Sequence, residues 1–250
     1  LLLGLDDRHG RILHVSGHPW VLNRAREINA VPGGGMAEEL VGTTIVNVVL
    51  AQDRPEYVLW SENYCQSFHP WASFGAPIRH PLTGETIGIV AISGYERVYE
   101  NADLVVRLAE RIQTLLHREE LIRRVALLDE YHRFVLQYPH DTILAVDARG
   151  RVCGASSSTV GLVNAPKSIL GQSLLRIPNF HVEGFRPVVE QEEARPYGVN
   201  VSLPEKSLSL TAEAIPVSGE RQPVGTLLIL PRLGGGRTGM RSNQRSPWTV

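Results

Sequence analysis

The sequence predicts an α+β protein in which two antiparallel-sheet domains are joined by one long amphipathic helix. Three observations lead to this fold class: hairpin signals at both ends of the first half, a similar pair in the second half, and a central stretch without glycine or proline. Strands that pair locally, with helices kept in separate segments, are typical of α+β domains. A chain of 250 residues has room for one or two domains.

The first half begins and ends with a hairpin signal. Asp6-Asp7-Arg8-His9-Gly10 and Pro81-Leu82-Thr83-Gly84-Glu85 each separate two apolar stretches. The chain can reverse there, because aspartate hydrogen-bonds its own backbone and glycine adopts positive φ. Residues 19–28 and 37–52 are predicted to be helical. We place this first domain at residues 1–96.

The second half repeats this layout after about 140 residues, a spacing too long for a solenoid. Asp147-Ala148-Arg149-Gly150 and Ser218-Gly219-Glu220 are its hairpin signals. The second domain is placed at residues 140–232. Residues 233–250 hold few aliphatic side chains among glycine, serine and arginine, so we expect a flexible linker there.

The linker between the two domains, residues 97–139, is predicted to be a helix from Asn101 to about Tyr138. It would extend over roughly 35 residues, or about 50 Å. A helix of this length cannot bury its whole apolar stripe on two small domains, and a second copy of the chain is its natural partner. The alternative is two shorter helices, broken near residues 118–120, each packed on its own domain. The apolar residues recur in a three-four alternation: Val105, Leu108, Ile112, Leu115, Ile122 and Ala126.

The composition excludes several classes of function. A net charge of -1 offers no general attraction to nucleic acid or to a membrane surface. No apolar run is long enough to span a bilayer. Cys65 and Cys153 form neither a disulfide framework nor a CxxC pair, so a cytoplasmic setting is expected. The chain starts without methionine and is expected to be an excerpt from a longer protein.

No motif for catalysis occurs in the sequence. Phosphate-binding loops, dinucleotide fingerprints, nucleophile elbows and zinc-protease motifs are all missing. Cys65 and His69 are too few to form a metal site. We therefore expect a protein that is not an enzyme, with no metal and no cofactor.

The densest group of chemically useful side chains lies at residues 60–71. Aromatic, thiol and imidazole groups could form the wall of a mostly apolar ligand pocket. The same side chains could equally be core residues, and the two interpretations are compatible. The candidate ligand-binding residues in this segment are Trp60, Tyr64, Cys65, Phe68, His69 and Trp71.

Residues 32–44 (PGGGMAEELVGTT), 62–65 (ENYC), 68–71 (FHPW) and 76–85 (APIRHPLTGE) resemble a known pattern. They are similar to the GAF domain of sigma-54-dependent activators of the acetoin-catabolism regulator type. The detailed resemblance covers roughly residues 1–95, and the PAS-like second half agrees mainly in layout. Members of the family often have other residues at the positions of Met36 and Thr44. These positions belong to the expected pocket region, so Met36 and Thr44 join the candidate ligand-binding set.

The resemblance implies a sensory region that binds a small-molecule effector and forms a homodimer through the linker helix. It also implies control of an AAA+ ATPase that acts on sigma-54 RNA polymerase, and a domain that binds DNA, both outside these residues. Two other functions remain open at this point. The chain could be a ligand-free dimerisation module, or the sensory region of a signalling kinase with His132 among the candidate phosphoacceptors.

Overall fold

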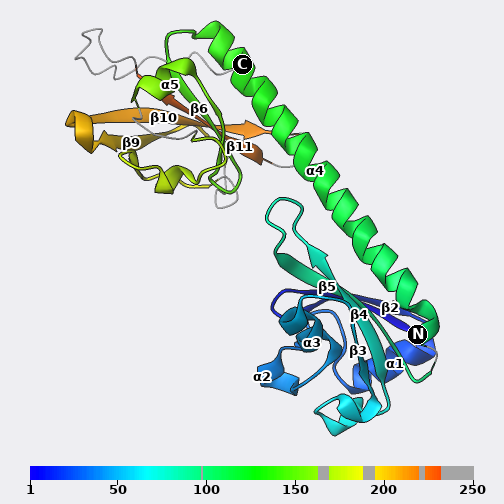
Figure 1. Cartoon of the computed structure of the whole chain (residues 1–250). Helices are drawn as coiled ribbons and strands as arrows, with labels where there is room; N and C mark the ends of the chain where they lie inside the picture. The colour runs from blue at the N-terminus through cyan, green and yellow to red at the C-terminus, as the bar shows by residue number, and fades with distance from the viewer. Residues whose placement is uncertain (97, 163–168, 188–194, 220–222, 232–250) are drawn as a thin grey trace. The chain divides into compact units, whose positions relative to one another are not determined.

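The computed structural model describes most of the chain, in two compact units: unit 1, Leu1–Glu120, and unit 2, Leu121–Val250 (Figure 1). The predicted linker at residues 233–250 lies outside the described part. No helix in that part is long and apolar enough to cross a membrane. The described residues are 1–96, 98–162, 169–187, 195–219 and 223–231.

Unit 1 is built on a five-stranded antiparallel sheet with the strand order β2-β1-β5-β4-β3. The first hairpin turns as the sequence predicts, because Asp7 Oδ1 accepts hydrogen bonds from the main-chain N–H groups of His9 and Arg11. Gly10 follows with a φ of 71°. The strands are β1 (Leu2–Asp7), β2 (Ile12–Gly17), β3 (Glu56–Leu59), β4 (Ala72–Arg79) and β5 (Thr86–Gly94).

Helices α1 (Pro19–Glu27), α2 (Glu38–Val41) and α3 (Ile45–Gln52) belong to the same unit. The prediction of one helix over residues 37–52 is wrong. Gly42 ends α2 with a φ of 69°, and Thr44 is extended before α3 begins. Glycine adopts a positive φ without steric cost, so the chain can leave the helix at this residue, which explains the break.

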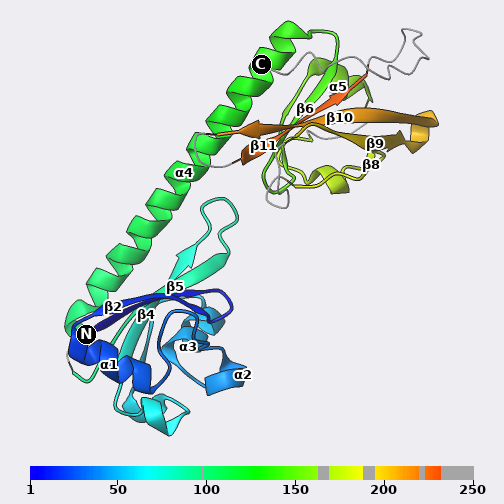
Figure 2. The same cartoon turned by 180° about the vertical axis from the view of Figure 1, so that it is seen from behind.

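Strands β4 and β5 are buried on both faces of the sheet. Ile89 and Ala91 of β5 lie in the core beneath α1 and α3, whereas Val90 and Ile92 face a second core. Val105 and Ala109 from the start of α4 complete that second core. Helices therefore cover both faces of the sheet, with α4 on the side opposite α3 (Figure 2).

The predicted linker helix is one unbroken element, α4 (Ala102–Gln137), of 36 residues. Its first half packs on the sheet of unit 1 and its second half packs on the sheet of unit 2, through Leu127, Tyr131 and Phe134. The alternative of two helices broken near residues 118–120 is wrong in its break. It is right that each half packs on its own domain.

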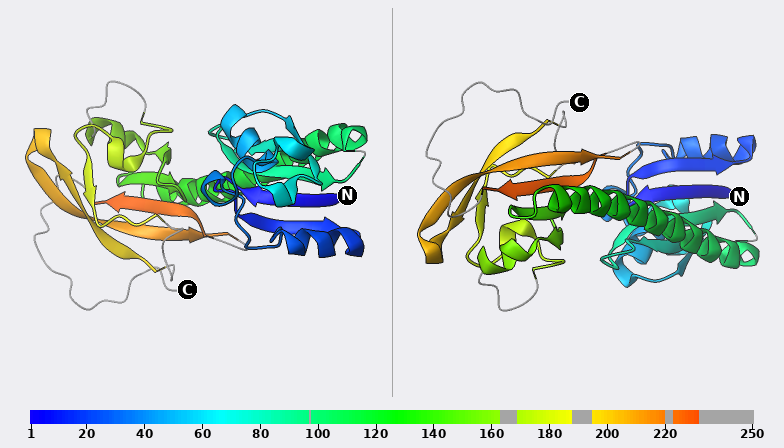
Figure 3. Two further views of the ribbon diagram at one scale, coloured as in Figure 1. Left: turned by 90° about the horizontal axis from the view of Figure 1, so that it is seen from below. Right: turned by 90° about the horizontal axis from the view of Figure 1, so that it is seen from above.

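Unit 2 contains a six-stranded antiparallel sheet with the strand order β7-β6-β11-β10-β9-β8. The first hairpin of unit 2, β6–β7, pairs with the last strand in the chain, β11, as β1–β2 pairs with β5 in unit 1. Asp147 Oδ1 accepts main-chain hydrogen bonds in its turn, as Asp7 Oδ1 does in unit 1. The long strands β10 and β11 lie side by side (orange to red in Figure 3). The elements are β6 (Thr142–Asp147), β7 (Val152–Ala155), α5 (Ser157–Leu162), β8 (His181–Glu183), β9 (Tyr197–Leu203), β10 (Leu208–Ser218) and β11 (Pro223–Leu230). The expected α+β class, with two antiparallel sheets and a long helix, is confirmed.

Candidate ligand pocket

Unit 1 contains a cavity of about 70 Å³ between its sheet and the layer of α3 and the loops around it. Most of its wall is apolar, and Met36, Ile45 and Phe68 contribute to it. About 10–15 Å³ of such volume holds one water molecule. The cavity thus has room for about five waters, or for an organic molecule with a similar number of non-hydrogen atoms.

The floor of the cavity is open because two small residues face each other on neighbouring strands. Gly4 of β1 pairs with Ala91 of β5. A Cβ atom placed on Gly4 would have its nearest neighbours at 3.7 Å, Asp6 Oδ2, and at 3.9 Å, the carbonyl oxygen of Ala91. Side chains of ordinary size at these two positions would fill the space.

Asp6 is the unusual polar group of this wall. The side chain is buried, with 4% of the residue exposed, and Oδ1 has no hydrogen-bond partner among the described residues. Burial, and to a smaller extent the charge of Asp7, raises the pKa of Asp6 from 3.8 to about 7. Buried carboxyl groups normally find partners, so an unpartnered one beside a cavity is a candidate for contact with a ligand.

The remaining polar residues of the wall are satisfied within the protein. Ser73 and Ser93, opposite each other on β4 and β5, share a hydrogen bond of 2.8 Å between their Oγ atoms. Asn63 Nδ2 donates to main-chain oxygens of residues 60, 68 and 71. Asn63 thereby holds the segment at residues 60–71 against the cavity.

The structure brings together four of the eight predicted site residues. Met36, Thr44, Phe68 and Trp71 line the cavity. Phe68 and Trp71 are three residues apart at a 3₁₀ turn (Gln66–Phe68), a geometry in which residues i and i+3 share one side.

The other four predicted residues do not line this cavity, which corrects the expected pocket wall. Trp60 and Tyr64 are 45% and 79% exposed, because they lie on the outer side of the turns. His69 Nε2 forms a 3.1 Å hydrogen bond with the main-chain oxygen of Asn63, and Cys65 Sγ lies 3.1 Å from Ser67 Oγ. Both contacts are local and stabilise the loop.

Asp6 was missed as a site residue because its sequence context indicates a turn. The turn is capped by Asp7, and Asp6 is the last inward-facing residue of β1, after Leu2 and Gly4. The alternation of these three residues was the signal available in the sequence. No group of three or more histidine, cysteine, aspartate or glutamate residues suited to a metal ion occurs in the described part of the chain.

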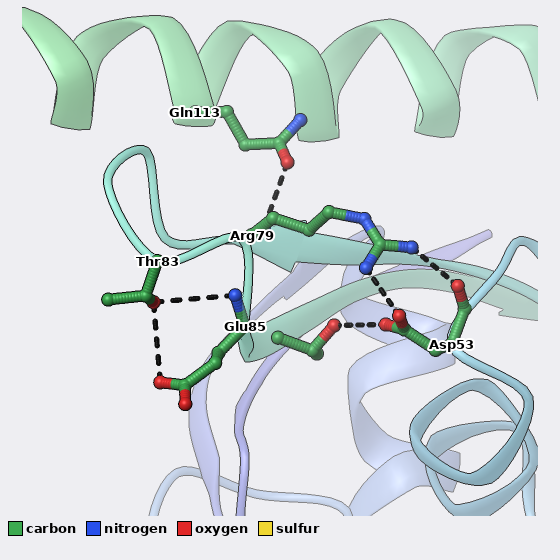
Figure 4. A network of polar contacts seen from close by, with 6 residues as sticks. Asp53, Arg79, Thr83, Glu85 and Gln113 are labelled. Carbon is green, nitrogen blue, oxygen red and sulfur yellow. Dashed lines mark hydrogen bonds and ion pairs between the residues drawn. The ribbon is translucent and has the colours of Figure 1, made fainter.

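A polar network connects α3, the β4–β5 hairpin and α4 at the end of the sheet (Figure 4). The carboxylate of Asp53, just after α3, accepts hydrogen bonds from the Arg79 guanidinium and the Thr86 hydroxyl. These bonds, Arg79 first, hold the pKa of Asp53 below its usual value. The main-chain N–H of Arg79 donates to Gln113 Oε1 on α4. Since Ile45 at the other end of α3 lines the cavity, α3 contacts both the cavity and the network.

Comparison with known proteins finds related transcriptional activators. The chain is 30% identical over 131 residues to the acetoin dehydrogenase operon transcriptional activator AcoR of Bacillus subtilis, covering 50% of this chain and 22% of that protein. It is 24% identical over 233 residues to the propane 2-monooxygenase operon transcriptional activator MimR of Mycolicibacterium goodii, covering 86% and 37%. An uncharacterized 47.3 kDa protein of Rhodococcus erythropolis is 35% identical over 98 residues, covering 39% and 22%.

The chain therefore spans about a fifth to two fifths of the length of these relatives: 22% of AcoR, 37% of MimR and 22% of the Rhodococcus protein. No family model matches it. Among solved structures, the Escherichia coli DhaR(N)–DhaL complex aligns with a TM-score of 0.47 at 16% identity, covering 93% of this chain and 79% of that one.

These relatives define the class to which the chain is similar: regulatory regions of bacterial transcriptional activators. The named relatives, AcoR and MimR, are transcriptional activators. The predicted resemblance to activators of the acetoin-catabolism regulator type is confirmed, and the relatives are regulators, as expected.

Proposed function

We propose that this chain is the sensory region of a sigma-54-dependent transcriptional activator and that the cavity of unit 1 binds a small-molecule effector. The cavity itself carries the proposal, since it encloses an unpartnered buried carboxyl group within an apolar wall. Such a combination of apolar surface and a few polar groups is typical of small-molecule sites. The relatives support a regulatory role, and the AAA+ and DNA-binding activities would belong to segments outside these residues.

The effector would act on α4 through the network at Asp53. A ligand shifts a conformational equilibrium only if it binds the two states with different affinity. A molecule in the cavity contacts α3, and any displacement of α3 is transmitted through Asp53 and Arg79 to Gln113. The network thus joins the end of α3 to the helix on the opposite face of the sheet.

The second half of α4 supports a homodimer. Leu121, Ile122 and Val125 lie within one face of the helix and are 48%, 52% and 57% exposed. Apolar side chains at this spacing on a long helix suit pairing with the same helix of a second copy. A dimer would give an effector a helix interface to rearrange.

The experiment compares ligand binding by the chain and by a variant with a filled cavity. Ala91→Leu places a larger side chain on the cavity floor, and Ala51→Leu, on the exposed surface of α3, is the matched control. We expect small neutral organic molecules to bind the unmodified chain and the Ala51→Leu control, as measured by calorimetry, and not to bind Ala91→Leu. Binding that persists in a folded Ala91→Leu variant would place the effector elsewhere.

A ligand-free dimerisation module is the second candidate, because the apolar patch on α4 does not depend on the cavity. In that case Ala91→Leu would stabilise unit 1 and leave self-association unchanged. No compound would then raise the melting temperature of the unmodified chain. Thermal unfolding with and without a compound library distinguishes the two candidates.

A further inference from the structure

We propose that Asp6 is the recognition residue of the cavity and that the effector is a small neutral molecule with a hydroxyl group, which binds this carboxyl; anionic effectors are excluded. This inference rests on the proposed sensing function and names the ligand class of the same site. It follows from the position, the environment and the hydrogen-bonding capacity of one side chain.

The position of Asp6 directs its carboxyl over the cavity floor. Asp6 lines the cavity, and Oδ2 lies 3.7 Å from the place that a Cβ atom on Gly4 would occupy. The carboxyl therefore reaches along β1 over the open floor at Gly4 and Ala91. Its other oxygen, Oδ1, is the buried atom without a partner. Oδ1 has almost no accessible surface, so a ligand lying on this floor would meet Oδ2.

The charge of the wall excludes anions. Asp6 is the single ionisable residue among the residues that line the cavity, and neither lysine, arginine nor histidine joins it there. A carboxylate or phosphate ligand would be desolvated with no cation to compensate, next to a group that is itself acidic. The same lack of a cation leaves Asp6 free for a neutral ligand.

The hydrogen-bonding capacity of Asp6 favours a hydroxyl over an ammonium group. A protonated carboxyl donates one hydrogen bond and accepts others, as a hydroxyl also does, so the two groups complement each other. The raised pKa of about 7 keeps the protonated form populated near neutral pH. An ammonium group has three donors and no acceptor, and would need several acceptors in this mostly apolar wall.

The far end of the floor suits the rest of the molecule. Asp6 pairs with Ile89 on β5, and Ser93 lies four residues farther along that strand, at about 13 Å for an extended strand. Ser73 and Ser93 already bond to each other there. The apolar part of the ligand would therefore extend from Gly4 and Ala91 along the floor towards this end, away from the carboxyl.

The test uses three probes of nearly the same shape: isobutanol, isobutylamine and isobutyrate. Each is titrated into the chain at pH 7, and the amide signals of Gly4 and Ala91 are followed by NMR. We expect isobutanol to shift these signals at concentrations at least about fivefold lower than those that either ion requires. The reason is that one lost hydrogen bond costs about 1 kcal/mol. The carboxylate should bind most weakly.

Variants at Asp6 show whether its carboxyl is responsible. Asp6→Asn keeps a donor and an acceptor and should retain isobutanol binding, whereas Asp6→Val should weaken it by about fivefold or more. Asp7→Asn is the matched control, because its amide oxygen can still cap the turn. It should leave binding unchanged.

The outcomes separate this inference from the proposed function. Binding that Ala91→Leu abolishes, but that prefers an ion or is unaffected by Asp6→Val, would overturn the role of Asp6 and leave the cavity as the sensing site. If none of the probes binds the cavity of the folded chain, both the sensing function and the role of Asp6 are contradicted.

Discussion

The main-chain N–H of Arg79, the last residue of β4, donates a 2.8 Å hydrogen bond to Gln113 Oε1 on α4. The same arginine binds the carboxylate of Asp53 through its side chain. One residue of the sheet thus contacts the end of α3 with its side chain and α4 with its backbone (Figure 4).

Loss of the Gln113 side chain should weaken the attachment of α4 to unit 1. Gln113→Ala leaves the Arg79 N–H without this acceptor, and we expect a loss of about 1 kcal/mol in the free energy of unfolding. Gln113→Glu keeps an acceptor and should restore most of it, while Gln137→Ala at the end of α4 is the control. Urea denaturation followed by tryptophan fluorescence measures this, because three of the four tryptophans, Trp20, Trp60 and Trp71, lie in unit 1. Equal effects of Gln113→Ala and Gln137→Ala would show that the bond does not contribute.

The Asp53–Arg79 pair should make unit 1 sensitive to acid. The folded-state pKa of Asp53 lies below its ordinary value of 3.8, so its contribution to stability is present above that pH and is lost as the pH falls below it. Asp53→Asn should reduce this loss of stability in acid. The measurement is the melting temperature of both proteins as the pH is lowered, and parallel curves would contradict the prediction.

The buried carboxyl of Asp6 should have the opposite effect on the pH dependence of stability. Its folded-state pKa is raised from 3.8 to about 7, so the folded state holds the proton more tightly, and the free energy of unfolding falls as the pH rises through this window. The full difference is on the order of 4 kcal/mol. Asp6→Asn should therefore be more stable than the unmodified chain at about pH 8, with the gap closing towards about pH 4. Chemical denaturation at several pH values tests this, and a gap independent of pH would refute it.

The apolar patch on α4 should control self-association. Ile122→Glu introduces a charge at a side chain that is 52% exposed, so the fold of one chain should tolerate it. If the patch forms a dimer interface, the dimer should weaken by about tenfold or more, since burying one such side chain contributes about 1.5–3 kcal/mol. Leu82→Glu, at a residue that is 47% exposed in the β4–β5 turn, is the control. Sedimentation equilibrium measures the association, and a monomeric unmodified chain would rule out this interface.

Much of the architecture could be predicted because it depends on neighbours in the sequence. Asp7 and Asp147 cap their turns through N–H groups two and four residues ahead. The long helix follows from a stretch without glycine or proline. The error at residues 37–52 arose from Gly42, since a glycine within an apolar helical pattern can either be tolerated or end the helix.

The candidate site could be predicted only in part. Phe68 and Trp71 point into the cavity while Trp60 and Tyr64 are exposed, although all four are aromatic residues of one short segment. Composition does not distinguish them, because their directions depend on the tight turns between them.

The sequence by itself determined the two hairpin-based sheets, the helix between them and the class of activator that the chain resembles. Tertiary structure alone decided that the cavity lies over Gly4 and Ala91 and that Asp6 faces it without a partner. The physical reason is register. A strand presents alternate residues to each face, and the pairing of β1 with β5, which joins distant parts of the chain, sets which small residues meet and which carboxyl is buried beside them.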